Sequence, residues 1–393
     1  MRESISSSRC VALVLLIGLF AARSAWAEVG AAPSEASGNA AMKYWQAFAL
    51  LPALDRDQEK LVDEWNKIPL DAAAMKLIDQ SQGSREYLVR GAKLASCDWS
   101  LDLEDGIFLR LPFLAKARLL ARLTALHARH EFSQKHWESG WNDITALLKL
   151  ARHCETAPMM IAQLVGYAIE ATAIEAAAPY LPEMKSSLPP KTADSLATLP
   201  KEPTVAELLA VEKQVGPQWL LNKMKDAEHK HPGSWKTAWN ETIDAANAGN
   251  EGAGGAKRDL TSKVVSLAQA TKWLEELLSL YDEGAKIAGL PPKEFDAAYP
   301  AFDKKAKAVN PIAEMFYPNL EKFVPMQRRH QAQDALFRGA VTVVQQGADK
   351  LKDMPDPSDV GPIEYRATDN GFELTSKVIF NGKPVSLTVG GGK

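Results

Sequence analysis

The stretch MMIAQLVGYAIEATAIEAAAPYL, residues 159–181, would be apolar on nearly all sides if it formed a helix. Such a helix must lie inside a core, because it has no polar face to present to water. Two amphipathic segments precede it, residues 113–134 and 140–153, and both repeat leucine at helical spacing. We therefore expect residues 113–181 to form the central three-helix unit of the protein.

Helical patterns continue on both sides of this unit. Capping boxes begin at Asp55 and Thr204, and each precedes an apolar repeat of helical period. Two long helices are expected at 257–288 and about 320–351, with Pro325 at the start or a kink of the second. The sequence thus predicts a mainly α fold, an antiparallel helix-hairpin array.

The last part of the chain changes to a β pattern. The runs IEYRAT, FELTSKVIF and PVSLTV are rich in β-forming residues, and Asp-Asn-Gly and Asn-Gly separate them. These turn sequences are strong hairpin signals. We expect a small three-stranded β-meander that packs on a helix, because an isolated sheet of this size is marginally stable.

The amino terminus has the features of a secretory signal peptide over residues 1–27. Arg2 and Arg9 precede a short apolar run, and Ala25 and Ala27 fit a signal peptidase. The run is too short to cross a bilayer, which takes about 20 residues. We expect an exported protein, periplasmic, envelope-associated or extracellular, with no stable membrane span after cleavage.

Composition shifts divide the rest of the chain into five parts. Residues 28–38 are small and polar and predict a disordered tether. An N-terminal helical domain at 39–184 is followed by a Pro-rich linker at 185–203. A C-terminal helical region with long helices covers 204–355, and 356–393 form the β-meander tail.

The charge balance argues against a nucleic-acid partner. The whole chain carries 46 Lys and Arg and 49 Asp and Glu, and residues 1–27 contain three of the arginines and one glutamate. The processed chain would then have a net charge of −5. No basic footprint for nucleic acid remains.

Two cysteines, Cys97 and Cys154, remain after cleavage. In an oxidising compartment they can form one disulfide. Alternatively both are buried free thiols, which behave as small apolar side chains. The sequence leaves both alternatives open.

A cluster of histidines, HARHEFSQKHW at 127–137, falls one residue short of a zinc-protease motif, because Gln134 stands where the second histidine would be. His127, His130 and Glu131 are candidate metal ligands, although one helix supplies only part of a coordination sphere. The alternative is that they are partly buried polar residues at the end of a helix.

A polar seam crosses the otherwise apolar helix 159–178. Gln163, Tyr167 and Glu170 align at spacings of four and three. A buried Glu170 would have a raised pKa and could act as a general acid or base, with His153 as a second catalytic candidate. The alternative is an internal hydrogen-bond network.

Several segments resemble known proteins. SQKHWESGWNDITALLKLARH is similar to half of a tetratricopeptide (TPR) unit, so the array is TPR-like in part. AAMKYWQAFALLP, CDWSLDLEDG, ALLKLARH and AIEATAIEA, within 39–184, resemble a group of uncharacterised exported proteins of planctomycete bacteria. The tail MPDPSDVGPIEYRATDNGFELTS resembles a degenerate pilin tail, without a prepilin leader. The resemblance implies location and architecture, and no reaction.

Three functions follow as expectations. The first is a scaffold that binds a protein or peptide in the cell envelope, because helical arrays present grooves to such partners. The second is a hydrolase, metal-dependent or not, that uses His127 and His130 with Glu170. The third is a subunit of a secretion or envelope assembly. No organic cofactor is expected, and His127, His130 and Glu131 are the candidate ligands for a metal ion.

Overall fold

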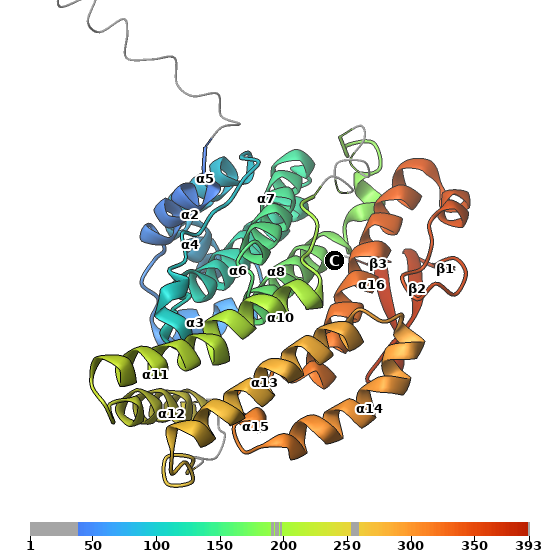
Figure 1. Ribbon diagram of the computed structural model, residues 1–393. Helices are drawn as coiled ribbons and strands as arrows, with labels where there is room; N and C mark the ends of the chain where they lie inside the picture. The colour runs from blue at the N-terminus through green and yellow to red at the C-terminus, as the bar shows by residue number, and fades with distance from the viewer. Residues whose placement is uncertain (1–37, 190–191, 193–195, 197–198, 253–258, 392–393) are drawn as a thin grey trace, which may run out of the picture.

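The computed structural model describes residues 38–189, 192, 196, 199–252 and 259–391. Within these ranges the chain is mostly α-helical and ends in a three-stranded antiparallel sheet, which confirms the predicted fold class (Figure 1). The predicted signal peptide, and the predicted tether apart from Gly38, lie outside the described residues. No helix among the described residues is long and apolar enough to cross a membrane.

Seven helices form an N-terminal bundle. They are α2 (Ala40–Ala49), α3 (Arg56–Asp63), α4 (Ala72–Gln80), α5 (Gln82–Ala92), α6 (Pro112–Ser133), α7 (Trp137–Glu155) and α8 (Met160–Ala177). The short 3₁₀ helices η2 (Leu103–Phe108) and η3 (Leu181–Met184) interrupt and follow them. Helices α6, α7 and α8 pack on one another, which confirms the central three-helix unit.

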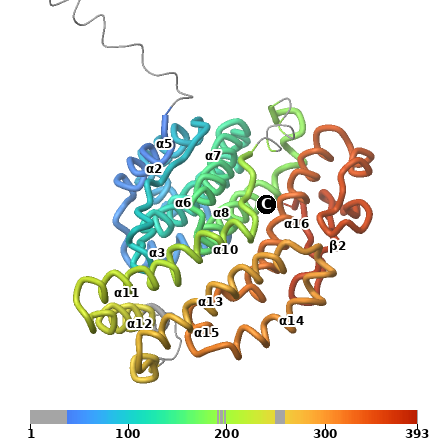
Figure 2. Tube along the Cα trace, viewed as in Figure 1, coloured from blue at the N-terminus to red at the C-terminus, as the bar shows by residue number. Residues whose placement is uncertain are grey.

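The second half of the chain adds seven more α-helices among the described residues. They are α10 (Val205–Lys213), α11 (Trp219–Lys230), α12 (Trp235–Gly252), α13 (Leu267–Ala288), α14 (Pro292–Val309), α15 (Ala313–Phe316) and α16 (Leu320–Gln346). A π-helical turn, η4 (Gln214–Gln218), joins α10 to α11, and the 3₁₀ helix η5 (Ala348–Asp353) follows α16. The tube in Figure 2 shows α10 and α13 side by side across the front of the molecule.

Two boundaries differ from the sequence prediction. Helix α13 begins at Leu267 and not near residue 257, because the Ser266 side chain accepts the Gln269 N–H and caps it. Helix α16 ends at Gln346, where Gly347 has a φ of 97° that stops the helix. Pro325 lies inside α16, in its second turn.

The sheet is a meander of β1 (Glu364–Thr368), β2 (Gly371–Phe380) and β3 (Lys383–Gly390), as predicted. Strand β2 is central and pairs antiparallel with both neighbours. Its inward side chains, Phe372 and Leu374, are buried, and the sheet packs on α16. The expectation that a helix covers the apolar face of the sheet is therefore confirmed.

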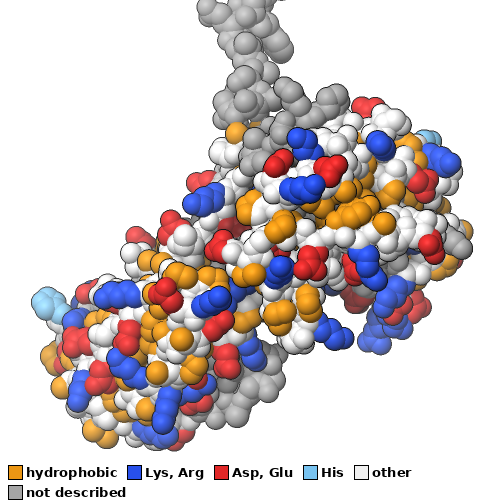
Figure 3. Space-filling model, turned by 90° about the vertical axis from the view of Figure 1, so that its right-hand side faces the viewer, with side chains coloured by type: hydrophobic (Ala, Val, Ile, Leu, Met, Phe, Trp, Pro, Cys, Tyr) orange, Lys and Arg blue, Asp and Glu red, His pale blue; other side chains and the backbone are white. Residues whose placement is uncertain are grey.

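The molecule has two hydrophobic cores, and they do not follow the order of the chain. The first joins the N-terminal bundle to the sheet and to the carboxyl half of α16. The second joins α10–α15 to the amino half of α16 and to Met160 at the start of α8. In the space-filling view of Figure 3 the molecule is elongated, with two bulges.

Helix α16 is the element that the two cores share. Phe323 and Val324 are buried in the second core, and Leu336 and Phe337 in the first. Between them the helix buries His330, which is 2% exposed, among other polar side chains. A polar junction therefore lies where the two cores meet.

Both cysteines are free thiols in the structure, Cys154 buried and Cys97 partly so. The disulfide that the sequence left open is not formed. Burial raises the pKa of both thiols, so neither is readily converted to the reactive thiolate.

Candidate functional site

A cluster of charged side chains lies at the junction of the two cores. We call it the junction cluster; it consists of Arg152, Glu155, Glu170, Glu202, His330 and Asp334. The first two come from the end of α7, Glu170 from α8, Glu202 from the segment before α10, and the last two from α16. The packing of these helices therefore brings together residues that are far apart in the sequence.

Arg152 is at the centre of the cluster. Its side chain is 5% exposed, and its two terminal nitrogens are shared among four carboxylates. The N–O distances are 3.1 Å to Glu155, 3.2 Å to Glu170, 2.6 Å to Glu202 and 3.7 Å to Asp334. Burial opposes its charge, but these carboxylates together raise the pKa of Arg152 above its ordinary value.

His330 approaches the same carboxylates from the α16 side. Its Nε2 lies 2.7 Å from Glu202 Oε1 and 3.9 Å from Glu170 Oε2. The ring stacks on Tyr167, with 4.0 Å between the ring centroids. Because Tyr167 fixes the plane of the imidazole, Nε2 is directed at the carboxylates.

Burial divides the carboxylates into two kinds. It raises the pKa of Glu155 and of Glu170 to about 8, because the nearby positive charges do not compensate fully for lost hydration. Glu202 is also buried, but its contacts with His330 and then Arg152 lower its pKa to about 2. At neutral pH Glu155 and Glu170 are therefore protonated, whereas Glu202 is ionised.

Several polar atoms of the cluster have no hydrogen-bond partner. They include Glu155 Oε1, both carboxylate oxygens of Glu170, and His330 Nε2. The Glu170 and His330 contacts given above are ion-pair distances without hydrogen-bond alignment. Buried unpaired polar atoms are costly in native proteins, and they often mark a functional role or an absent ligand.

Gly166 gives the Glu155 carboxyl its space. A Cβ atom at position 166 would lie 2.5 Å from both Glu155 Cγ and Glu155 Oε1. Glycine in the middle of a helix is unfavourable by about 1 kcal/mol relative to alanine. Its presence in α8 is therefore explained by the acid that packs over it.

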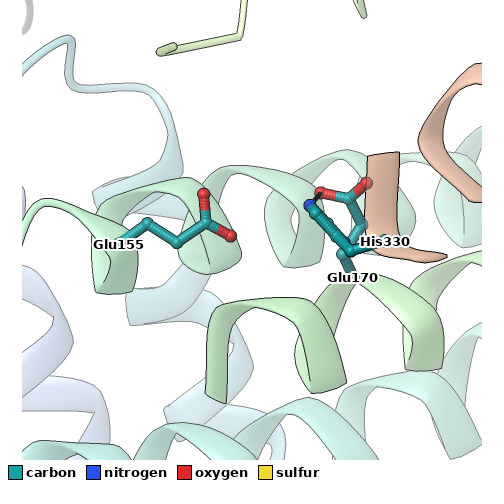
Figure 4. Close-up of side chains that lie close together, drawn as sticks. All are labelled: Glu155, Glu170 and His330. Carbon is teal, nitrogen blue, oxygen red and sulfur yellow. Dashed lines mark ion pairs between the residues drawn. The ribbon is translucent and has the colours of Figure 1, made fainter. Parts of the chain in front are cut away.

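Three of these side chains can share an ion. One ligand atom from each of Glu155, Glu170 and His330 lies within 4.8 Å of the others, and no other such group occurs among the described residues. In Figure 4 the His330 ring and the Glu170 carboxyl are adjacent, and the Glu155 carboxyl extends toward them from α7. All three side chains are almost completely buried.

A groove opens beside the cluster and follows α16. It consists of two adjoining hollows of about 660 and 500 Å³, which share Ala288, Gln327 and Gln331 in their walls. The larger hollow reaches Arg152, Glu202 and Asp334. We call the two together the α16 groove.

The histidines singled out from the sequence have other partners. His127 Nδ1 lies 2.5 Å from Asp143 Oδ2, and His127 Nε2 lies 3.8 Å from Glu131. His136 Nδ1 also approaches Glu131, at 3.4 Å. His130 does not join them, and its buried Nδ1 has no hydrogen-bond partner. The proposed ligand set of His127, His130 and Glu131 is thus not assembled, and Asp143 and His136 take the place of His130.

His153 and Glu170 do not form a catalytic pair. The Tyr44 hydroxyl and His153 Nδ1 are hydrogen-bonded at 2.7 Å, and Trp99 donates to the His153 carbonyl. Burial, with a contribution from Lys149, lowers the pKa of His153 to about 4, so it is a neutral core residue, and its buried Nε2 has no hydrogen-bond partner. Glu170 instead faces Arg152 and His330, and the expected convergence with His127 and His130 is absent.

The polar seam of α8 forms only part of the expected internal hydrogen-bond network, because the Tyr167 hydroxyl and the Glu170 oxygens have no hydrogen-bond partner. Gln163 Nε2 donates to the carbonyls of Glu155 and Ala157, and Tyr167 stacks on His330. Sequence reasoning missed Arg152, Glu202 and His330. The only local signal was a charged residue within a predicted apolar face, Arg152 beside Leu148 and Ala151, and this signal names no partner.

Comparison with known proteins gives no further guide. No protein-family model, curated protein or solved structure matches the chain. The junction cluster and the α16 groove are therefore interpreted from their own chemistry.

Proposed function

We propose that the protein is an exported binding protein of the cell envelope, and that its α16 groove holds an extended, acidic peptide segment of a partner. The observation that carries this proposal is the α16 groove itself, with its polar floor, apolar walls and excess of cationic side chains. The expected export, which rests on residues 1–27, gives the location.

The floor suits a peptide backbone. Gln327, Gln331, Asp334 and Arg338 follow one face of α16 at spacings of four, three and four. A glutamine side chain offers both a carbonyl acceptor and an NH₂ donor, which is the pair of groups that an extended peptide needs. Gln331 is exposed and available for such bonds.

The walls supply apolar contact at both ends. Leu290, Val324 and Ile379 line the smaller hollow, and Leu199 and Val205 line the larger one. Ile379 is 59% exposed. In Figure 3 the hydrophobic side chains on the visible face lie in separate patches among charged ones, which fits recognition of a short segment more than a broad apolar interface.

The charges favour an acidic occupant. Arg152 already pairs with the carboxylates of the junction cluster. Apart from it, the groove is lined by five basic side chains, Lys293, Arg328, Lys377, Lys201 and Arg338, and by three acidic ones, Asp296, Glu202 and Asp334. The chain as a whole carries a net charge of −3. A local cationic excess in an anionic protein attracts a segment that carries carboxylates.

The test is binding of labelled peptides, measured by fluorescence anisotropy. An acidic, leucine-containing peptide should bind, and the same peptide with lysine in place of each acid should bind at least about tenfold more weakly, as expected from lost charge complementarity. Ile379→Asp should weaken binding by a similar factor. Ile161→Asp is the matched control, because Ile161 is a 51% exposed isoleucine on α8 that does not line the groove. Equal binding of both peptides, or equal loss in both variants, would contradict the proposal.

A hydrolase is the second candidate, and one observation favours it. Glu155 lines a smaller hollow of about 370 Å³ beside Arg152 and Thr156, and burial raises its pKa to about 8. A protonated acid next to a guanidinium can donate a proton to a leaving group. Hydrolysis of a bound peptide by the wild type, lost in Glu155→Gln with binding retained, would support this candidate over simple binding.

A further inference from the structure

Glu155, Glu170 and His330 are buried side chains at the junction of the cores, and each has an oxygen or nitrogen atom without a hydrogen-bond partner. Glu155 Oε1, the Glu170 oxygens and His330 Nε2 all lack a hydrogen-bond partner, although each residue is at most 3% exposed at its side chain. One ligand atom from each lies within 4.8 Å of the other two. Such atoms are normally satisfied in native proteins, so their convergence indicates a missing partner.

The type of partner follows from the donors. Two carboxylate oxygens and one imidazole nitrogen form a mixed O/N set, which suits divalent transition metals such as Zn²⁺ and Mn²⁺. Ca²⁺ and Mg²⁺ prefer oxygen ligands alone. A metal ion can bind all three atoms at once.

The charge of the cluster points the same way. Glu155, Glu170, Glu202 and Asp334 supply four carboxylates, and the guanidiniums of Arg152 and Arg338 are the two cations paired with them. Metal ligands must be deprotonated, so an ion that binds Glu155 and Glu170 would displace the protons that these acids hold at neutral pH. With His330 neutral, the four carboxylates and two guanidiniums then have a net charge of −2, which a divalent ion balances.

We propose that Glu155, Glu170 and His330 bind one divalent transition-metal ion where the two hydrophobic cores meet. The ion would join α7 and α8 to α16, and so would connect the N-terminal bundle to the helix that both cores share. This inference goes beyond the peptide-binding function and does not depend on it.

The surroundings fit an ion at this place. Arg152 pairs with the Oε2 atoms of Glu155 and Glu170, and metal-binding carboxylates are commonly held by such outer contacts. Gly166 leaves room for the Glu155 carboxyl to turn. Ligand atoms around a zinc ion with bonds of about 2.1 Å lie about 3.4 Å apart, so the three side chains need to close by rotation about their own bonds. The hollow of about 370 Å³ at Arg152 and Glu155 gives access.

The experiment uses the purified protein, stripped with EDTA and dialysed against ZnCl₂ or MnCl₂. Metal content per chain is measured by elemental analysis, affinity by isothermal titration, and Tm by circular dichroism. Glu170→Gln and His330→Gln remove proposed ligands with little change in size. The control is the double variant His127→Gln and His136→Gln, which removes the only other histidines that approach a shared carboxylate, Glu131.

The expected result is one ion per chain in the wild type and in the control, with a rise in Tm on the order of 5 °C at a hundredfold excess over Kd. Glu170→Gln and His330→Gln should keep their helical spectrum and bind at least about tenfold more weakly. The proposal is overturned if neither ion binds the wild type at one per chain. It is equally overturned if the control loses the ion while Glu170→Gln keeps it, because the ion then lies at His127 and His136.

Discussion

Two regions of the protein hold a histidine among carboxylates, and they are built differently. Around His127, the partners Glu131 and Asp143 come from the same helix and from the next one. Around His330, the partners come from α8 and from the segment before α10. The first region follows from local sequence, whereas the second exists only because α16 crosses both cores.

The regions also differ in charge balance. His127 is 18% exposed at its side chain and Glu131 15%, so water reaches this region. In the junction cluster, Arg152, Glu155 and Glu170 are each at most 5% exposed. A similar set of residue types therefore forms a partly hydrated edge in one region and an almost completely buried cluster in the other.

The largest effect is expected from Arg152→Met. The substitution leaves buried carboxylates without their cation, and breaking one side of a buried ion pair costs about 3–5 kcal/mol. Urea unfolding at pH 7 measures the loss. Adding Glu202→Gln should recover part of it, because the carboxylate that stays ionised at neutral pH and that Arg152 contacts is then removed. A loss below about 1 kcal/mol would show that the junction cluster is more hydrated than the structure indicates.

The pH dependence of stability is the next test, on metal-free protein. The pKa values of Glu155 and Glu170 are about 8 in the folded protein, whereas the ordinary value for a glutamate, as in the unfolded chain, is 4.5. Between these values the folded state holds more protons than the unfolded chain, so the free energy of unfolding falls as pH rises from about 5 to 8. Glu170→Gln should flatten this fall by about half, since one of the two groups is removed. An unchanged slope would contradict the raised pKa of Glu170.

Gly166→Ala should have an intermediate effect. The new methyl group meets the Glu155 side chain at 2.5 Å, and overpacking of this kind costs about 1–3 kcal/mol. Gly216→Ala is the matched control, because no atom lies within 4 Å of a Cβ added there. Thermal unfolding of both variants gives the comparison. Equal stability of the two would mean that Glu155 moves aside without cost.

The smallest effect is expected at the first region, from Asp143→Asn. The variant keeps the shape of the side chain and weakens its contact with His127, which should cost about 1–2 kcal/mol. Urea unfolding of Asp143→Asn and of Arg152→Met under the same conditions compares the loss of unfolding free energy in the two regions. A loss at Asp143 as large as that at Arg152 would erase the difference between the regions.

Much of the fold could be predicted from the sequence. The all-round apolar character of residues 159–181 predicted a buried helix, and α8 is that helix, with Ile169 and Ala173 in the first core. The turns at Asp369-Asn370-Gly371 and Asn381-Gly382 predicted the two hairpins of the meander. These features depend on neighbours in sequence, and local patterns report them well.

Only part of the candidate site could be predicted from the sequence. Spacing on one helix aligned Gln163, Tyr167 and Glu170, and the structure buries all three, with Tyr167 and Glu170 beside His330. The same reasoning assigned Glu170 to His127 and His130 and gave no role to His330, which lies 160 residues after Glu170 (330 − 170). Helical periodicity reports which face a residue occupies, and it contains no information on which distant helix covers that face.

Backbone propensity and apolar spacing over a few residues predicted most of the helices, the capping boxes at Asp55 and Thr204, the buried character of α8 and the closing meander. Only the tertiary structure decided that α16 would serve two cores and that its polar stretch would meet Arg152, Glu155 and Glu170. The physical reason is that burial of charge depends on summed packing from segments far apart in the chain. A short stretch of the sequence does not show which distant segments will pack against it.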